Sequence, residues 1–489
     1  MTLEDLYPKL FIGGEWVTPA STRRHTVISP LTEEPIAEVA LASNEDMDAA
    51  VAAARAAFDE GPWPRMPIEE RIAVMERWLE LITARKDEFA NLITSEMGMP
   101  ITVATGGQAG IGLMLLQDAI RIAREFTWME TRIAPIGNAI VSREPVGVVA
   151  SVVPWNGPLS VALLKLPPAL LAGCTVVYKT SPESTLDGYL LIDLLKQAGL
   201  PDGVLNLVPA AREESAYLVT HPGVDKVSFT GSTVAGATIG SEIAKDFKRL
   251  TLELGGKSAA IVLDDADVDQ FVAATKGLSF GYSGQRCTNK TRLIVPRSRA
   301  EEITAKLAEM ISALKVGDPF DPATEVGPMT TSQHRDRVEG YIQAGIDEGA
   351  RLVVGGLGRP EGLDKGWFVK PTLFADATND MRICQEEIFG PVVAVIAYDT
   401  VEEAIAIAND SKYGLSGSVF SADPKRAFDV ARRIRTGTVE INGCTPGFHV
   451  PLGGFKSSGI GREAGPEGFS AFTELKTYGL PDGVAETLV

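Results

Sequence analysis

Residues 146–156 read VGVVASVVPWN, a mostly β-branched run that gives way to Pro-Trp-Asn. Similar runs, separated by helical stretches, follow at 175–178, 204–208, 226–229 and 259–263, and a second series follows at 292–295, 392–397, 418–420 and 438–441. Short apolar strands that alternate with helices are typical of parallel sheets. The sequence therefore predicts an α/β fold, and because there are two series, it predicts two domains with a cleft between them.

Amphipathic helices are predicted before the first of these strands. Ser43 is a suitable N-cap for a helix whose apolar residues recur at helical spacing as far as Phe58. A second helix is expected to begin near Pro67, and a third at residues 89–97 is expected to stop at Gly98.

A thiol and a carboxylate are the candidate reactive groups. Cys287 lies in the polar, glycine-flanked stretch FGYSGQRCTN (280–289), between the two strand series. We expect the positive field of Arg286 to lower the pKa of this thiol and make it nucleophilic. Glu253 follows a short apolar run and precedes Gly255, where a strand would end, which suits a general base. Taken alone, a single cysteine is more often a small buried side chain.

Composition excludes several classes of function. The chain has 489 residues, 45% hydrophobic and 22% charged, as in ordinary globular proteins. Lys and Arg number 46 against 64 Asp and Glu, and this net charge of −18 argues against nucleic-acid binding. No segment is long and apolar enough for a membrane span, and the N-terminus has no secretory pattern. We therefore expect no nucleic-acid or membrane partner.

The placement of the cysteines and histidines indicates which stabilising or metal-binding sites to expect. The four cysteines (Cys174, Cys287, Cys384 and Cys444) show no CxxC spacing, and the four histidines are scattered. Neither a disulfide framework nor a metal site is predicted, and we expect a reduced, cytoplasmic, metal-independent protein.

Six short motifs occur along the chain and include both candidate reactive residues. They are, in order, PWN (154–156), FTGST (229–233), LELGG (252–256), GQRC (284–287), EEIFGP (386–391) and PLGGFKSSG (451–459). Together they closely resemble the aldehyde dehydrogenase superfamily over essentially the whole chain. The resemblance implies a variant Rossmann coenzyme-binding domain at 1–126 and 146–254, an α/β catalytic domain at 255–453, and a small β-element for oligomerisation at 127–145 and 470–489. A dimer or tetramer is implied.

The coenzyme follows from the resemblance rather than from a motif, because no GxGxxG fingerprint is present. NAD is implied, and NADP is possible. The residues implied in coenzyme binding are Val153, Pro154, Trp155, Lys179, Gly231, Ser232, Glu387 and Phe389. Pro182 stands where the family usually has an acid, with Glu183 one residue further on. This shift removes a carboxylate that would repel a 2′-phosphate, although Glu183 could restore the NAD preference.

The chemistry requires a nucleophile, an oxyanion site and a base. A thiolate adds to the aldehyde, the adduct expels hydride to the nicotinamide, and activated water hydrolyses the thioester. Cys287 is the expected nucleophile, Glu253 the base for water, and Asn156 the oxyanion donor together with the Cys287 N–H group. The resemblance also implies a proton relay through Glu474.

Four positions suggest the kind of substrate. Gly157, Val161, Leu164 and Leu452 stand where the family often has larger or aromatic side chains. Their small size predicts a wide apolar tunnel that accepts a bulky aldehyde, such as an aromatic or terpenoid one.

Three alternatives remain. A CoA-acylating semialdehyde dehydrogenase has little use for Glu253, because CoA takes the acyl group there. A non-catalytic family member has no need for Cys287, Glu253 and Asn156 together. A thiol hydrolase fits poorly, because no histidine lies near either reactive segment.

Overall fold

The computed structural model describes residues 2–133, 135–447, 449–481 and 484. Its first half, together with β19 from much later in the chain, forms a sheet of eight strands in the order β19-β11-β10-β7-β8-β9-β1-β2. Their bounds are β1 (Leu10–Ile12), β2 (Glu15–Val17), β7 (Val148–Val152), β8 (Thr175–Lys179), β9 (Leu205–Leu207), β10 (Lys226–Thr230), β11 (Arg249–Glu253) and β19 (Gly459–Ile460). The five central strands from β11 to β9 are parallel, and the strands at both ends are antiparallel to their neighbours.

Helices cover both faces of this sheet. Along β7, Val148 and Ala150 belong to a core cluster with α1, α8 and α9, whereas Val149 belongs to a second cluster with α2, α3, α5, α6 and α7. The bounds are α1 (Asn44–Asp59), α2 (Ile68–Ala84), α3 (Lys86–Met97), α4 (Ile101–Val103), α5 (Ile111–Glu125), α6 (Pro158–Ala172), α7 (Leu186–Gln197), α8 (Arg212–Thr220) and α9 (Thr233–Ala244). Burial on both faces explains why these strands are apolar throughout rather than alternating.

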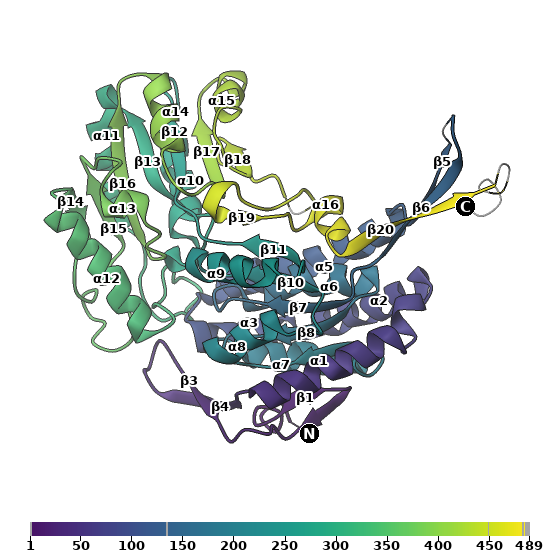
Figure 1. Cartoon of the computed structure of the whole chain (residues 1–489). Helices are drawn as coiled ribbons and strands as arrows, with labels where there is room; N and C mark the ends of the chain where they lie inside the picture. Colours follow the sequence, from purple (N-terminus) through teal and green to yellow (C-terminus); the bar gives the residue numbers. More distant parts are fainter. Residues whose placement is uncertain (1, 134, 448, 482–483, 485–489) are drawn as a thin grey trace.

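The second half is built on a sheet of seven strands in the order β14-β15-β16-β13-β12-β17-β18, all parallel except β14. The strands are β12 (Ser258–Val262), β13 (Lys290–Pro296), β14 (Arg351–Val354), β15 (Thr372–Ala375), β16 (Val392–Tyr398), β17 (Ser416–Phe420) and β18 (Thr438–Ile441). The helices are α10 (Val268–Phe280), α11 (Ala300–Ser312), α12 (Ser332–Asp347), α13 (Arg382–Gln385), α14 (Val401–Asn409) and α15 (Pro424–Ala431). Figure 1 shows the two sheets in separate halves, with β10, β11 and α9 towards their junction.

Two smaller sheets complete the fold. β3 (Arg24–Ile28) pairs with β4 (Pro35–Ala40), and β6 (Asn138–Pro145) lies between β5 (Met129–Ile133) and β20 (Thr473–Leu480). The three-stranded sheet extends away from the body, and its strand β20 follows the short helix α16 (Gly465–Ser470) in the chain (Figure 1). It carries apolar side chains in water, with Ile133 67% and Leu475 64% exposed.

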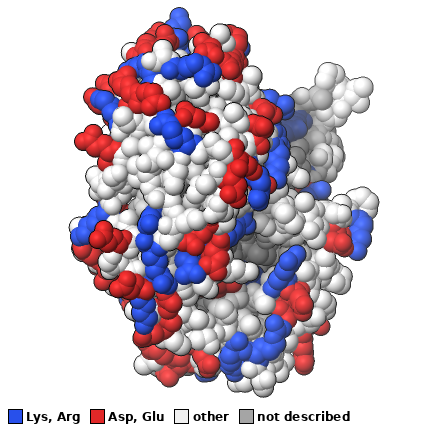
Figure 2. All heavy atoms as spheres, turned by 90° about the vertical axis from the view of Figure 1, so that its left-hand side faces the viewer, with Lys and Arg blue, Asp and Glu red and all other residues white. Residues whose placement is uncertain are grey.

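The expected early helices are confirmed in their signals as well as their positions. Ser43 caps α1 in a capping box with Asp46. α3 ends at Gly98, whose φ of 71° lies in the left-handed region that favours glycine. Charged side chains of both signs are interspersed on the face that Figure 2 presents. No described helix is both long and apolar enough to cross a membrane.

One strand assignment was wrong. Residues 259–263, counted with the first series, form β12 in the seven-stranded sheet, where they pair with β13 and β17. The fifth parallel strand of the first sheet is β11, which ends at Glu253. β12 (SAAIV) is the more apolar segment and β11 (RLTLE) alternates leucine with polar residues, so apolar composition indicated the wrong segment for this sheet.

Candidate active site

A cavity of about 470 Å³ contains the thiol and most of the residues expected around it. Its lining includes Cys287, Asn156 and all four expected substrate residues: Gly157, Val161, Leu164 and Leu452. The last three are apolar, as are other lining residues such as Ile111 and Leu115. The cavity is therefore large enough and apolar enough for a sizeable organic molecule.

Local structure explains how α6 contributes to this wall. Gly157 precedes Pro158, which takes the first helical position, where its missing N–H costs nothing. A Cβ on Gly157 would lie 3.0 Å from Val161 Cγ2, so the wall is already tight on the helix side.

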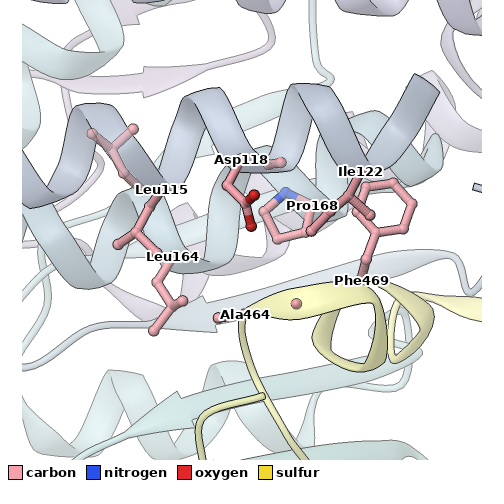
Figure 3. A pocket seen from close by; sticks show the side chains of 10 residues that line it. Leu115, Asp118, Ile122, Leu164, Pro168, Ala464 and Phe469 are labelled. Carbon is pink, nitrogen blue, oxygen red and sulfur yellow. The ribbon is translucent and has the colours of Figure 1, made fainter. Parts of the chain in front are cut away.

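A small pocket of about 20 Å³ borders the cavity between α5, α6 and the segment that enters α16. Figure 3 shows Leu115 and Leu164 on the first two elements and Ala464 on the third. These three residues line the pocket and the main cavity alike. Leu164 therefore stands between the cavity and this further apolar space.

The loop that presents Cys287 is held by tight backbone packing. Tyr282 and Ser283 have φ of 57° and 55°, and Gly284 follows with φ of 81°. A Cβ on Gly284 would lie 2.1 Å from the carbonyl carbon of Gly390, so only glycine fits there. The rigid loop fixes the position of the thiol that follows it.

Arg286 lowers the pKa of the thiol, as expected, but the expected net lowering of that pKa is wrong. Burial raises the pKa of Cys287 to about 12, Glu387 and Glu253 raise it further, and Arg286 opposes this only in part. The guanidinium group is committed elsewhere: it donates to Asn289 Oδ1 and Gly277 O, both at 2.9 Å. The thiol is therefore protonated at neutral pH in this structure, although the residue is partly exposed to the cavity.

Asn156 is oriented towards the thiol loop. It follows β7, and its Nδ2 donates to Gln285 O at 3.0 Å, two residues before Cys287. This bond uses one of the two amide N–H groups and leaves the other for a ligand.

Glu253 is buried at the carboxyl end of β11, and its Oε1 has no hydrogen-bond partner among the described residues. Burial raises its pKa well above the usual value, the nearby Glu463 raises it further, and Lys165 and Arg462 lower it. A carboxyl group with a raised pKa that is free to accept a proton has the properties of a general base.

Two residues near Glu253 were missed by the sequence analysis. Lys165 Nζ lies 2.5 Å from Glu463 Oε1, with side-chain exposures of 0% and 3%, and Ser228 Oγ contacts both groups. Lys165 is the one charged residue in α6, and this isolation in an otherwise apolar helix was a usable signal. Glu463 had no such signal.

Glu474, the expected proton relay, does not lie at this site. It sits on β20 opposite Glu144, forms an exposed ion pair with Arg249, and lines a different surface hollow. The structure instead brings Glu463, eleven residues earlier in the chain, beside Glu253. Both acids follow the last glycine-rich motif, so sequence order alone did not distinguish them.

Several expected coenzyme residues lie at the carboxyl ends of parallel strands in the eight-stranded sheet. Lys179, at the end of β8, is 8% exposed and makes no side-chain hydrogen bond or ion pair with a described residue, and burial lowers its pKa to about 8. Gly231 and Ser232 lie between β10 and α9, and Ser232 caps that helix by accepting from Ala235 N. Val153 and Pro154 directly follow β7.

Glu387 and Phe389 lie on the other side of the junction, in the loop before β16, and Trp155 contacts Phe389 from the loop after β7. Glu387 Oε1 accepts a hydrogen bond from Gly256 N at 2.9 Å. Phe389 has φ of 64°, and its ring lies 5.5 Å from that of Trp155. These contacts join the loops after β11 and β7 to the loop before β16.

Known proteins resemble this chain in sequence and in fold. A family model described as "Aldehyde dehydrogenase family" matches residues 16–478. The chain is 45% identical over 481 residues to geranial dehydrogenase from Castellaniella defragrans, covering 98% of this chain and 100% of that one. An aldehyde dehydrogenase from Mycobacterium tuberculosis, solved with NAD⁺, is 48% identical with a TM-score of 0.95, covering 98% and 99% of the two chains.

A second solved structure holds a substrate-like molecule. A mutant of aldehyde dehydrogenase C from Pseudomonas syringae, complexed with NAD⁺ and octanal, is 42% identical with a TM-score of 0.94 and 97% coverage of both chains. The present chain thus belongs to the aldehyde dehydrogenase family. Within that family it is an NAD-dependent enzyme that oxidises aldehydes, and the predicted α/β fold with Rossmann-like and catalytic domains is confirmed.

Proposed function

We propose that this enzyme oxidises bulky apolar aldehydes to carboxylic acids without CoA, through a thioester on Cys287. The observation that carries the proposal is the apolar cavity of about 470 Å³, which Cys287 and Asn156 line together. The similarity to geranial dehydrogenase supports a terpenoid substrate, and the octanal complex of a second relative supports an extended apolar one.

The proposed coenzyme site fits a dinucleotide. Lys179 is a buried cation that makes no side-chain hydrogen bond or ion pair with a described residue, which suits ribose hydroxyl groups, and Thr230 Oγ1 beside Gly231 is buried without a hydrogen-bond partner among the described residues. The N-terminus of α9 behind Ser232 is suited to a pyrophosphate. We assign Glu387 to the nicotinamide ribose and Phe389 with Trp155 to the nicotinamide end. When bound, the coenzyme supplies the hydride acceptor.

In the first half-reaction, Cys287 must lose a proton, because its pKa is about 12. The proton passes to water in the cavity that Cys287 lines, and Glu253 is assigned to the hydrolysis step. The thiolate sulfur then bonds to the aldehyde carbon, and the free N–H of Asn156 and the backbone N–H of Cys287 stabilise the oxygen that gains charge. Loss of hydride leaves the thioester.

In the second half-reaction, Glu253 removes a proton from water as the water oxygen attacks the thioester carbon. The C–S bond breaks as the carboxylic acid leaves, and the Cys287 thiolate takes up a proton from water. We assign the Lys165–Glu463 pair to the route by which Glu253 returns its proton to solvent, in place of Glu474.

The test is a set of aldehydes assayed with NAD⁺ and NADP⁺ in parallel: geranial, octanal, benzaldehyde and acetaldehyde. We expect kcat/KM to be higher for geranial or octanal than for acetaldehyde, and no stimulation by CoA. A preference for acetaldehyde would contradict the substrate class, and CoA-dependent turnover would contradict hydrolysis.

Glu253→Gln distinguishes the two half-reactions. We expect a burst of NADH close to one equivalent per site, followed by slow turnover, because hydrolysis loses its base. Cys287→Ala is the matched control and should give neither burst nor turnover while still binding NAD⁺. If Glu253→Gln also lacks the burst, the main role of Glu253 is to activate Cys287.

We also propose that the three-stranded sheet mediates self-association into a dimer or tetramer. Its exposed Ile133 and Leu475 are the supporting observation. Leu475→Lys should shift the mass measured by light scattering towards the monomer, and an unchanged mass would contradict this role. The cytoplasmic location stays a prediction from the cysteine pattern.

A further inference from the structure

An ion pair in the wall of the substrate cavity has no role in the reaction described above. Glu440, on β18, lines the same cavity as Cys287, and its Oε1 lies 2.8 Å from Lys290 Nζ. The side chains are 11% and 1% exposed. Charged residues are rarely buried this deeply unless they are paired, and a cavity lined mainly by apolar residues gains nothing from such a pair for apolar substrates.

The strand explains why Glu440 faces the cavity. Its neighbours Val439 and Ile441 pack in the core cluster with α14 and α15, so the side chain between them points to the opposite face. Lys290 begins β13, three residues after Cys287. Burial lowers the pKa of Lys290, and Cys287 is close enough to oppose this shift. The pair is therefore near the reactive thiol.

One of the two oxygens of the Glu440 carboxylate makes no hydrogen bond with a described residue. Its Oε2 is buried and has no hydrogen-bond partner among the described residues. A buried carboxylate oxygen without a donor is unfavourable, and a donor delivered by a ligand would relieve the cost. The cavity that Glu440 lines has room for a ligand at Gly277, where an added Cβ would meet no atom within 4 Å.

The charge of the pair limits which donor fits. Lys290 already balances the Glu440 charge, so an ammonium group on the ligand would leave a net positive charge buried. A neutral hydroxyl group can donate to Oε2 without that cost. The cavity thus combines apolar walls with one directional acceptor.

We propose that Glu440 Oε2 accepts a hydrogen bond from a hydroxyl group on the aldehyde substrate, so that the preferred substrates are hydroxylated apolar aldehydes. This inference rests on the proposed function and narrows its substrate class. Lys290 is a positioning residue that holds Oε1 and so fixes the orientation of the carboxylate in the cavity wall.

The test compares aldehydes in which a hydroxyl group replaces a methyl group of similar size. Suitable pairs are 3-hydroxy- and 3-methylbenzaldehyde, 4-hydroxy- and 4-methylbenzaldehyde, and 4-(hydroxymethyl)- and 4-ethylbenzaldehyde, which place the hydroxyl at different depths. For each pair, the ratio of kcat/KM (hydroxyl over methyl) is measured in the wild type and in the double variant Lys290→Met/Glu440→Leu. We expect the ratio to fall at least tenfold for one pair or more, mainly through KM.

The double variant removes both charges, so neither is left buried alone. The matched control is Arg297→Met/Asp399→Leu, which removes an exposed pair whose side chains are 59% and 61% exposed, and its ratios should stay at wild-type values. Ratios that change less than twofold for every pair in the Lys290/Glu440 variant would overturn the inference and leave the pair a structural one.

A binding measurement keeps the inference testable if the double variant folds poorly. In Cys287→Ala, which retains the Lys290–Glu440 pair, a hydroxylated aldehyde should bind at least as tightly as its methyl counterpart, measured by calorimetry. Tenfold weaker binding of the hydroxyl member in all three pairs would overturn the inference. Failure of the wild type to oxidise any aldehyde would instead contradict the proposed function itself.

Discussion

The Lys165–Glu463 pair permits a quantitative prediction, because both side chains are almost completely buried. Changing Glu463 to Leu leaves the Lys165 ammonium group buried without its counter-ion, with Ser228 Oγ as its remaining contact. Removing one partner of a buried pair destabilises a protein by about 3–5 kcal/mol. For a domain of about 150–250 residues this corresponds to a fall of roughly 6–20 °C in the unfolding midpoint.

The assay is thermal unfolding followed by intrinsic fluorescence at fixed protein concentration, because self-association would shift the midpoint. Lys165→Met should cost a similar amount as Glu463→Leu, since it leaves Glu463 unpaired beside Glu253. The double variant should lose far less than the sum of the two, because no isolated charge remains.

Glu474 supplies the matched control. Its pair with Arg249 is exposed, with side-chain exposures of 42% and 60%, and such pairs are worth about 0–1 kcal/mol. Glu474→Gln should therefore shift the midpoint by a few degrees at most. Strictly additive effects of Lys165→Met and Glu463→Leu, or equal shifts for the Glu463 and Glu474 variants, would refute the argument.

The same pair also affects the pH dependence of turnover. Glu253 acts as a base only when it has lost its proton, and Glu463 raises its pKa. Glu463→Gln removes that negative charge, so Glu253 should lose its proton more easily and the acidic limb of kcat should move to lower pH. A limb that moves to higher pH would show that the Glu463 charge does not act on Glu253 in this way.

Three further predictions concern the thiol, the cavity and the coenzyme. The rate of iodoacetamide modification of coenzyme-free enzyme at Cys287 should still rise above pH 9, because burial raises its pKa to about 12, and a plateau below pH 8 would contradict this. Gly157→Phe should lower kcat/KM for geranial at least tenfold more than for acetaldehyde, with Gly157→Ala as control, and an unchanged ranking would count against the substrate assignment. NAD⁺ should be preferred over NADP⁺ in kcat/KM. Glu183 lies near enough to Lys179 to raise its pKa, so the Glu183 carboxylate should repel the 2′-phosphate of NADP⁺. A tenfold preference for NADP⁺, about 1.4 kcal/mol, would reverse the assignment.

Local patterns predicted those features that depend on neighbouring residues in the sequence. The Ser43 capping box, the end of α3 at Gly98 and most of the parallel strands all follow from short-range rules. The grouping of Asn156 with the four substrate residues around Cys287 followed from the family resemblance, and the structure brings these residues to one cavity.

Long-range features could not be predicted in this way. Lys165 and Glu463 are 298 residues apart, and nothing in either segment indicates its partner. The pKa of Cys287 depends chiefly on how deeply the folded chain buries the thiol and on the Glu387 and Glu253 carboxyl groups that it brings near. Proximity in sequence identified Arg286, which lowers this pKa, but it did not reveal the burial that outweighs that effect.

The pairing of β19 with β11 has a consequence for biosynthesis. The base Glu253 is flanked by Gly459 on the neighbouring strand, and Glu463 follows four residues later. Glu463 leaves the ribosome about 176 residues after Cys287, a delay of roughly 9–35 s at bacterial and eukaryotic translation rates. During that interval the nascent chain already contains its thiol but lacks the segment that completes the surroundings of Glu253. Under the proposed mechanism, the chain can hydrolyse the thioester fully only after Glu463 has been translated, and a chain that stops before residue 459 lacks both β19 and Glu463.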